Sequence, residues 1–281
     1  MSELLRVENI SYRYDRKILA INNISATINA GERVAVLGGN GAGKSTFFLC
    51  CNGVLRPQSG KIFYKGQEIS KSKKEMYKLR QAVGLVFQDP DSQIIAGSVE
   101  SEVSFGPMNL RMPLDEVVSR VEKALMQMDI GNYRDYAPQY LSGGEKKRVS
   151  IADILAMQPE IILFDEPTAS LDPRNANALE GIVDELSKAG IAVVISTHDV
   201  NFAYRITQSA IVFAQGEIIA DADIDEVFAH DRTLEIAGLK KPLLYEAFDC
   251  IQSVFPDLLK GEKPRTIEEF KTYFIREKMH V

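Results

Sequence analysis

Four short apolar runs, rich in β-branched residues, recur along the chain and are separated by helix-like stretches. The runs are "RVAVLG" (33–38), "AVGLVFQ" (82–88), "EIILFDE" (160–166) and "IAVVISTH" (191–198). Nearly continuous apolar runs of this length are typical of strands buried on both faces, as in a parallel sheet between helices. The pattern therefore predicts an α/β fold.

Other stretches of the chain show different patterns. The N-terminal stretch 3–30 is strand-rich, and 208–221 is expected to form two strands around the hairpin turn signal Gln215-Gly216. The segment from about 95 to 158 is expected to be a mostly helical subdomain. Within it, apolar residues recur at helical spacing, namely Val117, Val121, Leu125 and Met128.

After about Asp231 the pattern changes again. A helical face is predicted from the spacing of Leu244, Phe248, Ile251 and Phe255. A second helix begins at a capping box formed by Thr266 and Glu269. We therefore expect a main domain over residues 1–231 and a small helical C-terminal appendage over residues 232–281.

Each of the four apolar runs ends in a residue of chemical interest. These residues are Gly38, Gln88, Asp165 with Glu166, and His198. Ligands of open α/β sheets bind outside the carboxyl ends of the strands. Because four such ends are expected at one edge, that edge is the predicted site.

The segment "GGNGAGKS" (38–45) matches the phosphate-loop pattern G-x-x-x-x-G-K-[ST] between a predicted strand and a helix. Its glycines let backbone N–H groups point at phosphate oxygens. Lys44 adds a positive charge near the β- and γ-phosphates, and the Ser45 hydroxyl can ligate Mg²⁺. The alternative is a glycine-rich strand–helix turn that binds nothing.

The segment "IILFDEP" places two carboxylates at the end of a buried strand. Asp165 is expected to hold Mg²⁺, directly or through water, and Glu166 to deprotonate an attacking water. Two surface carboxylates that begin a turn before Pro167 are the alternative reading.

The segment "LSGGEKKRVSIAD" (141–153) predicts a second anion site. Ser142, Gly143 and Gly144 precede a helix-favouring run, and backbone donors at the start of a helix bind anions. The segment does not say which anion this second site binds.

Composition narrows the class of protein. The chain has 33 basic and 39 acidic residues, a net charge of −6 and a pI near 5.3, which argues against a nucleic-acid partner.

No apolar run approaches the roughly 18 residues needed to span a bilayer, and "MSELLRVENI" does not resemble a secretion signal. The cysteines Cys50, Cys51 and Cys250 show no paired spacing, which fits a reducing compartment. We expect a cytoplasmic chain whose membrane role, if any, comes through a partner.

Together these motifs resemble the ATPases of ATP-binding-cassette (ABC) transporters over roughly residues 3–230. The matching segments, in order, are Walker A (38–45), the Q-loop glutamine Gln88, the signature "LSGGE" (141–145), Walker B (161–165) with Glu166, the D-loop "SLDP" (170–173) and the switch histidine His198. The signature is the specific one, because many phosphate-loop proteins have Walker motifs. The resemblance implies a P-loop NTPase fold of the ABC ATPase type, with a mixed core sheet, an antiparallel N-terminal β part, a helical subdomain and a helical C-terminal appendage.

The resemblance also implies roles for single residues. ATP and Mg²⁺ are the expected cofactors, and Tyr14 stacks on the adenine, with Tyr12 as the alternative. Gln88 contacts Mg²⁺ or the attacking water, His198 holds the γ-phosphate, and Asp172 bridges two subunits. The nucleotide-binding residues are Tyr14, Gly38, Gly39, Asn40, Gly41, Ala42, Gly43, Lys44, Ser45 and Thr46.

In such ATPases the signature of one subunit covers the nucleotide of the other. Ser142, Gly143 and Gly144 are thus expected to donate to the γ-phosphate of ATP on a second ABC ATPase subunit, either a copy of this chain or a paralogue. Two departures from the family pattern are Gly39, where many relatives have proline or serine, and Glu145, in place of glutamine. We expect the carboxylate of Glu145 to face away from the phosphate.

The region after Gln88 and the C-terminal appendage resemble the ATPases of energy-coupling-factor importers, which take up vitamins and transition metals. "LSGGEKKR" is similar to the cobalt/nickel members. This implies a transmembrane coupling subunit and a substrate-binding membrane protein as partners, and a peripheral place at the cytoplasmic face of the cell membrane.

Four other functions remain open. They are the ATPase of another ABC transporter, a soluble ABC ATPase, a regulatory module without turnover and a P-loop kinase. A soluble ABC ATPase usually has two cassettes or a coiled-coil insertion, and neither is visible. Glu166 and His198 speak against a regulatory module, and the signature is unexplained in a kinase.

Overall fold

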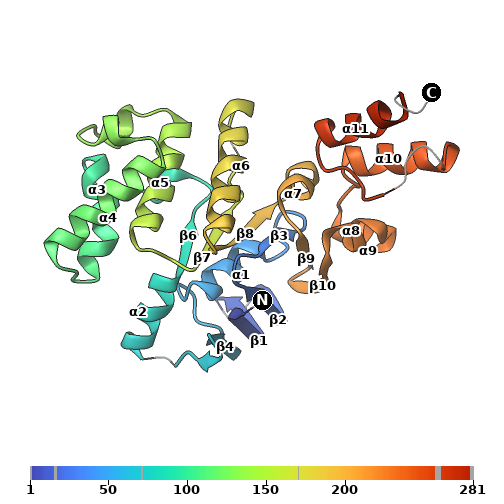
Figure 1. The fold of residues 1–281 in the computed structure, drawn as a ribbon. Helices are drawn as coiled ribbons and strands as arrows, with labels where there is room; N and C mark the ends of the chain where they lie inside the picture. The colour runs from blue at the N-terminus through green and yellow to red at the C-terminus, as the bar shows by residue number, and fades with distance from the viewer. Residues whose placement is uncertain (1, 16–17, 71, 170, 257–260, 279–281) are drawn as a thin grey trace.

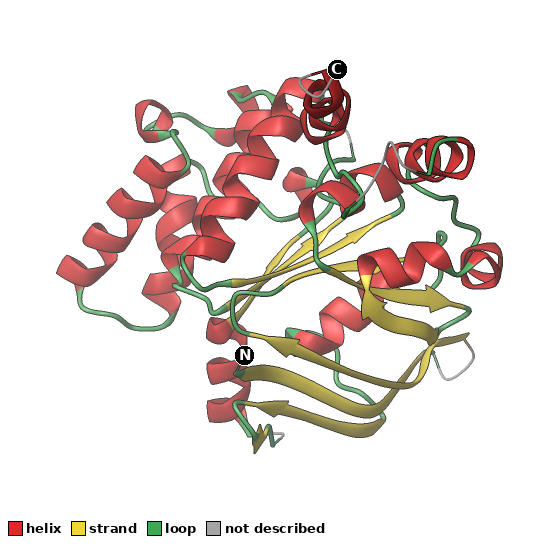
Figure 2. Cartoon of the chain, turned by 45° about the vertical axis from the view of Figure 1, so that its right-hand side comes forward, coloured by secondary structure: helices red, strands yellow, loops and turns green. Residues whose placement is uncertain are grey.

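The computed structural model describes residues 2–15, 18–70, 72–169, 171–256 and 261–278 of the 281-residue chain. Its centre is a six-stranded sheet with the order β10-β9-β3-β8-β7-β6 (Figures 1 and 2). The strands are β3 (Arg33–Leu37), β6 (Val83–Val86), β7 (Ile161–Asp165), β8 (Ala192–Thr197), β9 (Ser209–Ala214) and β10 (Glu217–Asp223). Neighbouring strands are parallel except β9 and β10, which are antiparallel, so the sheet is mixed as expected.

The four apolar runs form β3, β6, β7 and β8, and the burial of β7 explains why they are continuous. Ile161 and Leu163 lie in the core on one face of the sheet, while Ile162 and Phe164 lie in the core on the other face. All four side chains are fully buried. Side chains of a strand alternate between faces, so a strand covered on both sides needs apolar residues at every position.

A second, four-stranded sheet has the order β2-β1-β4-β5 and is antiparallel. Its strands are β1 (Glu3–Tyr14), β2 (Ile18–Asn29), β4 (Ser59–Tyr64) and β5 (Gln67–Glu68). The predicted hairpin between β9 and β10 is also present. Gln215 and Gly216 have φ values of 51° and 82°, the left-handed pair that a two-residue hairpin loop requires.

Three helices between β6 and β7 pack against one another on one side of the core sheet (Figure 1). They are α3 (Val99–Asn109), α4 (Leu114–Gln127) and α5 (Gly143–Ala156). The predicted apolar face of α4 is buried, from Val117 through Val121 and Leu125 to Met128. The other helices are α1 (Lys44–Cys51), α2 (Lys73–Ala82), α6 (Pro173–Lys188), α7 (Val200–Ile206), α8 (Ile224–Ala229), α9 (Asp231–Ala237), α10 (Leu243–Val254) and α11 (Ile267–Lys278). Within the described residues, none of the helices has the length and apolar character needed to cross a membrane.

The C-terminal helices pack differently from the predicted pattern. Tyr245 of α10 is buried against Tyr204 and Phe228, with ring centroids 5.7 and 6.2 Å away. Phe248 faces Tyr273 of α11 at 5.6 Å. The predicted Phe255 lies beyond the end of α10 and is exposed, because the helix meets the rest of the chain through Tyr245, which the spacing did not single out.

The predicted capping box before α11 is half formed. The amide N–H of Glu269 donates to Thr266 Oγ1 at 3.1 Å, but the Glu269 carboxylate accepts from the amide of Arg265 at 2.7 Å instead of from Thr266. The division of the chain at residue 231 stays a prediction.

Substituting Tyr245→Ala is expected to detach α10 and α11 from the rest of the chain. Loss of a buried aromatic ring costs about 3 kcal/mol or more, and the ring of Tyr245 packs α10 against Tyr204 and Phe228. Limited proteolysis followed by mass spectrometry should show faster cleavage after residue 237. Phe255→Ala, which removes an exposed ring of the same segment, is the matched control. Equal cleavage of the two variants would contradict the docking role of Tyr245.

Candidate functional site

The phosphate loop lies between β3 and α1, in a conformation that requires glycine at two places. Gly38 and Gly43 have φ values of 146° and 111°. A Cβ atom at Gly38 would come within 2.4 Å of the Phe213 carbonyl oxygen, and one at Gly43 within 2.7 Å of that of Ala20. Both neighbours are backbone atoms that cannot yield. At Gly39, by contrast, a Cβ would meet only Ala237 O at 3.7 Å, so a larger residue fits there.

The other residues of the motif follow in order. Asn40, Gly41 and Ala42 complete the loop, and Lys44, Ser45 and Thr46 form the first turn of α1. No side chain caps this helix, so its first N–H groups remain available as donors. A helix start with free N–H groups and a lysine is a site for a negatively charged group such as phosphate.

Lys44 is buried and points back across the loop. Its Nζ donates to the carbonyl oxygens of Gly38 at 2.7 Å and Gly39 at 3.2 Å. The same Nζ lies 3.5 Å from Glu166 Oε1. The loop and the end of β7 are therefore joined by one cation.

Glu166 lies between two partners. While Oε1 faces Lys44, Oε2 is 2.9 Å from Nδ1 of His198, which follows β8. Glu166 has a φ of 42°, an uncommon left-handed conformation for a residue with a side chain. Strained backbone of this kind is a recurrent feature of functional sites. The structure thus brings Lys44, Glu166 and His198 together. Glu166 and His198 were among the predicted strand-end residues, whereas no contact among the described residues joins the side chain of Gln88 to them.

Ser196 is a residue of this site that the sequence analysis missed. Its hydroxyl is fully buried, donates to Asp165 Oδ1 at 2.5 Å and accepts from the Glu166 amide at 3.1 Å. One side chain on β8 therefore holds the carboxylate of Asp165 and the backbone of Glu166 at the end of β7. The signal was a serine that directly follows the apolar residues 191–195, two residues before His198.

Tyr14 lies beside the start of α1, whereas Gln88 follows β6, which is separated from β3 by β8 and β7. Tyr14 ends β1, and its hydroxyl is 3.3 Å from Thr46 Oγ1. Tyr12 packs against the Tyr14 ring edge-on at 5.0 Å. The side chain of Gln88, two residues beyond β6, is exposed.

The signature lies on a different part of the molecule. Ser142 caps α5, and Gly143 and Gly144 are its first residues; in the described ranges no hydrogen bond joins them to the phosphate loop. A Cβ at Gly144 would come within 2.5 Å of the Asn175 side chain. Figure 1 shows α5 among the helices beside the sheet and α1 under its centre. The chain does not bring its two anion sites together.

Glu145 turns back toward the signature serine, and its orientation relative to a bound phosphate stays a prediction. Its Oε2 accepts from the amide and the hydroxyl of Ser142, both at 2.7 Å, in a capping box. Hydrogen bonds from Tyr133 and then Ser142 lower the pKa of Glu145 below its usual value. The carboxylate therefore holds the Ser142 hydroxyl.

Asp172 caps α6. It accepts from the Asn175 amide at 2.8 Å and from the Asn175 side chain at 2.9 Å, and these bonds lower its pKa. Ser170, which begins the predicted D-loop, lies outside the described residues.

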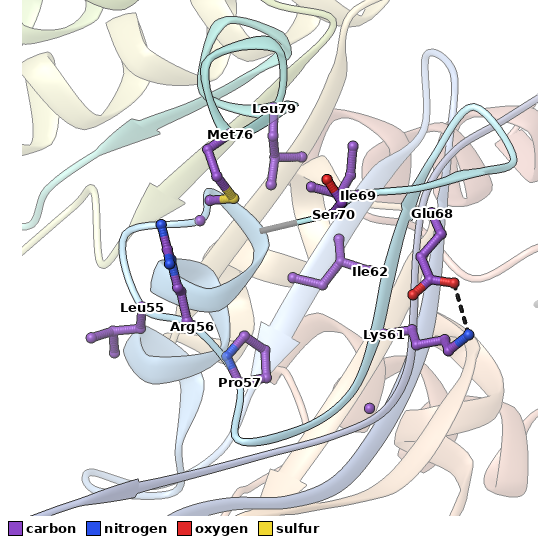
Figure 3. A pocket seen from close by; sticks show the side chains of 12 residues that line it. Leu55, Arg56, Pro57, Lys61, Ile62, Glu68, Ile69, Ser70, Met76 and Leu79 are labelled. Carbon is purple, nitrogen blue, oxygen red and sulfur yellow. Dashed lines mark hydrogen bonds and ion pairs between the residues drawn. The ribbon is translucent and has the colours of Figure 1, made fainter. Parts of the chain in front are cut away.

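A cavity of about 320 Å³ lies between the end of α1, β4 and α2 (Figure 3). Its wall combines apolar side chains such as Ile62 and Met76 with the ion pair of Lys61 and Glu68, 2.7 Å apart. The phosphate loop and the ends of β7 and β8 contribute nothing to its lining. This cavity is therefore separate from the place where the polar strand ends meet.

Comparison with known proteins agrees with this geometry. A family model described as ABC transporter matches residues 21–169. The energy-coupling factor transporter ATP-binding protein EcfA of Methanothermobacter thermautotrophicus is 45% identical over 239 residues, which cover 85% of this chain and 77% of the relative. The structure of cbiO1 from Clostridium perfringens, described as part of the ABC transporter complex cbiONQ, is similar with a TM-score of 0.75 and 37% identity, and the match covers 91% of this chain and 97% of that one.

A third likeness is to the ATP-binding cassette MJ0796, in a dimeric post-hydrolysis structure bound to ADP and Pi. The TM-score is 0.70 at 27% identity, and the match covers 79% of this chain and 99% of that one. The family match includes everything from the phosphate loop through the signature to Glu166. The chain belongs to the ABC transporter family, in which it is an ATP-hydrolysing subunit of the energy-coupling factor type.

Proposed function

We propose that the residues at the edge of the core sheet bind and hydrolyse ATP between two subunits, and that this reaction powers the import of a transition metal such as cobalt, or of a vitamin. The observation that carries the proposal is the position of Glu166, with Lys44 3.5 Å from one carboxylate oxygen and His198 2.9 Å from the other. A carboxylate between a phosphate-binding lysine and a histidine is suited to take a proton from a water that attacks the γ-phosphate.

The phosphate loop supplies the binding half of the reaction. The N–H groups at the start of α1 donate to the phosphates, and Lys44 exchanges its two carbonyl acceptors for phosphate oxygens. His198 then contacts the γ-phosphate while its contact with Glu166 keeps the base in place. Tyr14, whose hydroxyl reaches Thr46, offers its ring to the adenine beside the loop.

Mg²⁺ fits the oxygen donors at this edge. Ser45, Asp165 and Gln88 supply a hydroxyl, a carboxylate and an amide oxygen, which are ligands that Mg²⁺ prefers. Within the described part of the chain, Asp165 Oδ1 is engaged by Ser196 and Oδ2 accepts no hydrogen bond, so one oxygen remains for a cation or its water. When bound, Mg²⁺ neutralises charge on the phosphates.

The signature acts on a second subunit. Ser142 and Gly143 are exposed at the N-terminus of α5, and this helix end favours a negative charge. Because the chain does not bring its own loop to this helix, the phosphate comes from a copy or a paralogue. The dimer of the related cassette MJ0796 supports this arrangement. Asp172, exposed at the start of α6, contacts the partner in the same interface.

The membrane partners are a transmembrane coupling subunit and a substrate-binding membrane protein, which hold the chain at the cytoplasmic face of the cell membrane. Large apolar side chains are exposed in the segment that follows the Q-loop, at Ile95 and, on α3, at Phe105 and Met108. Such a surface beside the site suits docking of a transmembrane subunit. The relative cbiO1, described as part of the ABC transporter complex cbiONQ, supports an assembly with other subunits.

Glu166→Gln is expected to lower ATP turnover by about 10²- to 10⁴-fold, the contribution typical of a general base, and to leave ATP binding intact. The trapped nucleotide then holds two chains together, and light scattering should show twice the monomer mass when ATP is added. Adding Lys44→Ala to this variant removes the phosphate contact and should return it to a monomer. If the Glu166→Gln chain stays monomeric with saturating ATP, the proposal that ATP binds between two subunits is wrong.

Ser196→Ala is expected to lower turnover about tenfold, because a group that orients a metal ligand typically contributes 10- to 100-fold. The loss should be partly relieved at raised Mg²⁺. Ser150→Ala is the matched control, since Ser150 is equally buried but its hydroxyl donates to the Lys146 carbonyl of its own helix. If both alanine variants hydrolyse ATP like the wild type, Ser196 does not orient Asp165.

Purification of the tagged chain from detergent-solubilised native membranes tests the importer assignment. We expect it to recover a transmembrane coupling subunit and a small substrate-binding membrane protein. Recovery of nucleic acid or of cytoplasmic partners alone would refute the transporter assignment and leave the ATPase chemistry in place.

A further inference from the structure

Lys147 is a buried lysine that the proposed reaction does not use. It lies on α5, the helix that begins with the signature, and only 3% of it is exposed. Its Nζ donates to the carbonyl oxygens of Phe87 at 2.7 Å and of Gln88 at 3.2 Å. These two carbonyls belong to the peptide units before and after Gln88, so one ammonium group fixes both.

Two other side chains tie the Q-loop, here residues 87–93, to the same helix. Gln93 accepts from the Phe87 amide at 3.1 Å and donates to the Ser150 carbonyl at 2.9 Å. Lys146 forms an ion pair with Asp91 at 2.6 Å. Lys147 differs from both because it is buried and holds the backbone of the glutamine itself.

Burial of this ammonium group is unfavourable unless its donors are engaged. Burial lowers the pKa of Lys147 to about 8, against the opposing effects of Asp165 and Asp89. Among the described residues no carboxylate lies within ion-pair distance of Nζ, so the carbonyl oxygens of Phe87 and Gln88 are its partners. A buried donor resists leaving such acceptors, because separation would strand a polar group out of water. The hydrogen bonds of Lys147 therefore connect α5 firmly to the backbone at Gln88.

We propose that Lys147 is a positioning residue that fixes Gln88 to the signature helix, so that engagement of Ser142–Gly144 by a partner's nucleotide sets the position of Gln88 at the chain's own nucleotide. The inference rests on the proposed function, because it assigns Gln88 and the signature to two different nucleotides. It makes α5 the link between the two sites of a dimer.

The geometry of α5 supports a rigid link. Lys147 lies three residues beyond Gly144, about 4.5 Å along the helix at 1.5 Å per residue. A shift of the helix start toward a phosphate therefore carries Nζ with it. Nζ is bonded to the carbonyl oxygens before and after the Gln88 side chain, so a movement of α5 also moves Gln88. The movement is thus passed to the site formed by the phosphate loop, Asp165 and Glu166 without a change in the core sheet.

Lys147→Met and Lys147→Gln form a matched pair for testing this. Both remove the charge and have similar length, but glutamine keeps two N–H donors for the carbonyls. Arg148→Met, on the neighbouring position of α5, is the control for loss of one positive charge. The full-length chains are compared by hydrogen exchange over residues 87–94, by ATP titration and by the dependence of hydrolysis rate on ATP concentration.

For Lys147→Met we expect about tenfold faster exchange over residues 87–94, about tenfold lower turnover with nearly unchanged ATP affinity, and loss of the positive cooperativity in ATP that a coupled dimer shows. Lys147→Gln should recover part of each effect, and Arg148→Met should behave as the wild type. The inference is wrong if Lys147→Met keeps wild-type exchange and cooperativity, or if it only lowers the melting temperature.

The hydrogen-exchange comparison needs no ATP turnover. It therefore tests whether Lys147 holds the Gln88 backbone even if the hydrolysis assay fails. Failure of the proposed function is seen separately, in a Glu166→Gln chain that does not dimerise with ATP. A chain that dimerises with ATP, while Lys147→Met leaves the 87–94 segment and the cooperativity unchanged, overturns the role of Lys147 alone.

Discussion

The placement of one carboxylate between two cationic or polar partners is the constraint on which the site depends. Glu166 faces Lys44 on one side and His198 on the other, at 3.5 and 2.9 Å. These residues come from the phosphate loop, β7 and β8, which are adjacent in the order β3-β8-β7 of the core sheet. Since all three strands are parallel, their carboxyl ends meet at one edge, and the burial of their apolar residues fixes that edge in place.

The backbone at this edge adopts conformations that few residues tolerate. Gly38 and Gly43 could not carry a side chain without meeting a carbonyl oxygen, and Glu166 takes a left-handed φ of 42°. A residue other than glycine in that region costs about 1 kcal/mol or more. The amide of Glu166 is held by the carbonyl and the hydroxyl of Ser196, which offsets part of this cost. The strained backbone of Glu166 and the hydrogen bonds that offset its cost therefore lie at the residue that we propose as the general base.

In our proposal the helix α5 connects the two halves of a site shared between subunits. Its N-terminus presents Ser142 and two glycines, and Glu145 holds the Ser142 hydroxyl through a capping box. Three residues after Gly144, the ammonium group of Lys147 donates to the backbone carbonyl oxygens of Phe87 and Gln88. In a dimer, one rigid element would thus touch the partner's phosphate and carry the residue that approaches the chain's own nucleotide. Such an arrangement lets the two nucleotides influence each other through packing and hydrogen bonds, without a change in the core sheet.

Local patterns in the sequence were enough to predict several elements. Continuous apolar runs predicted β3, β6, β7 and β8, and fixed spacing predicted the phosphate loop and the turn at Gln215-Gly216. The convergence of Gly38, Asp165, Glu166 and His198 followed from one general property of parallel sheets. Contacts between residues far apart in the chain depend on how the elements pack, and they could be seen only in the folded molecule. Ser196 and Lys147 were missed because their partners, Asp165 and the Gln88 backbone, lie 31 and 59 residues away. The predicted apolar face of α10 was wrong at Phe255. Periodicity shows that a helix has an apolar face, but the surface against which the helix packs decides which of its residues are buried.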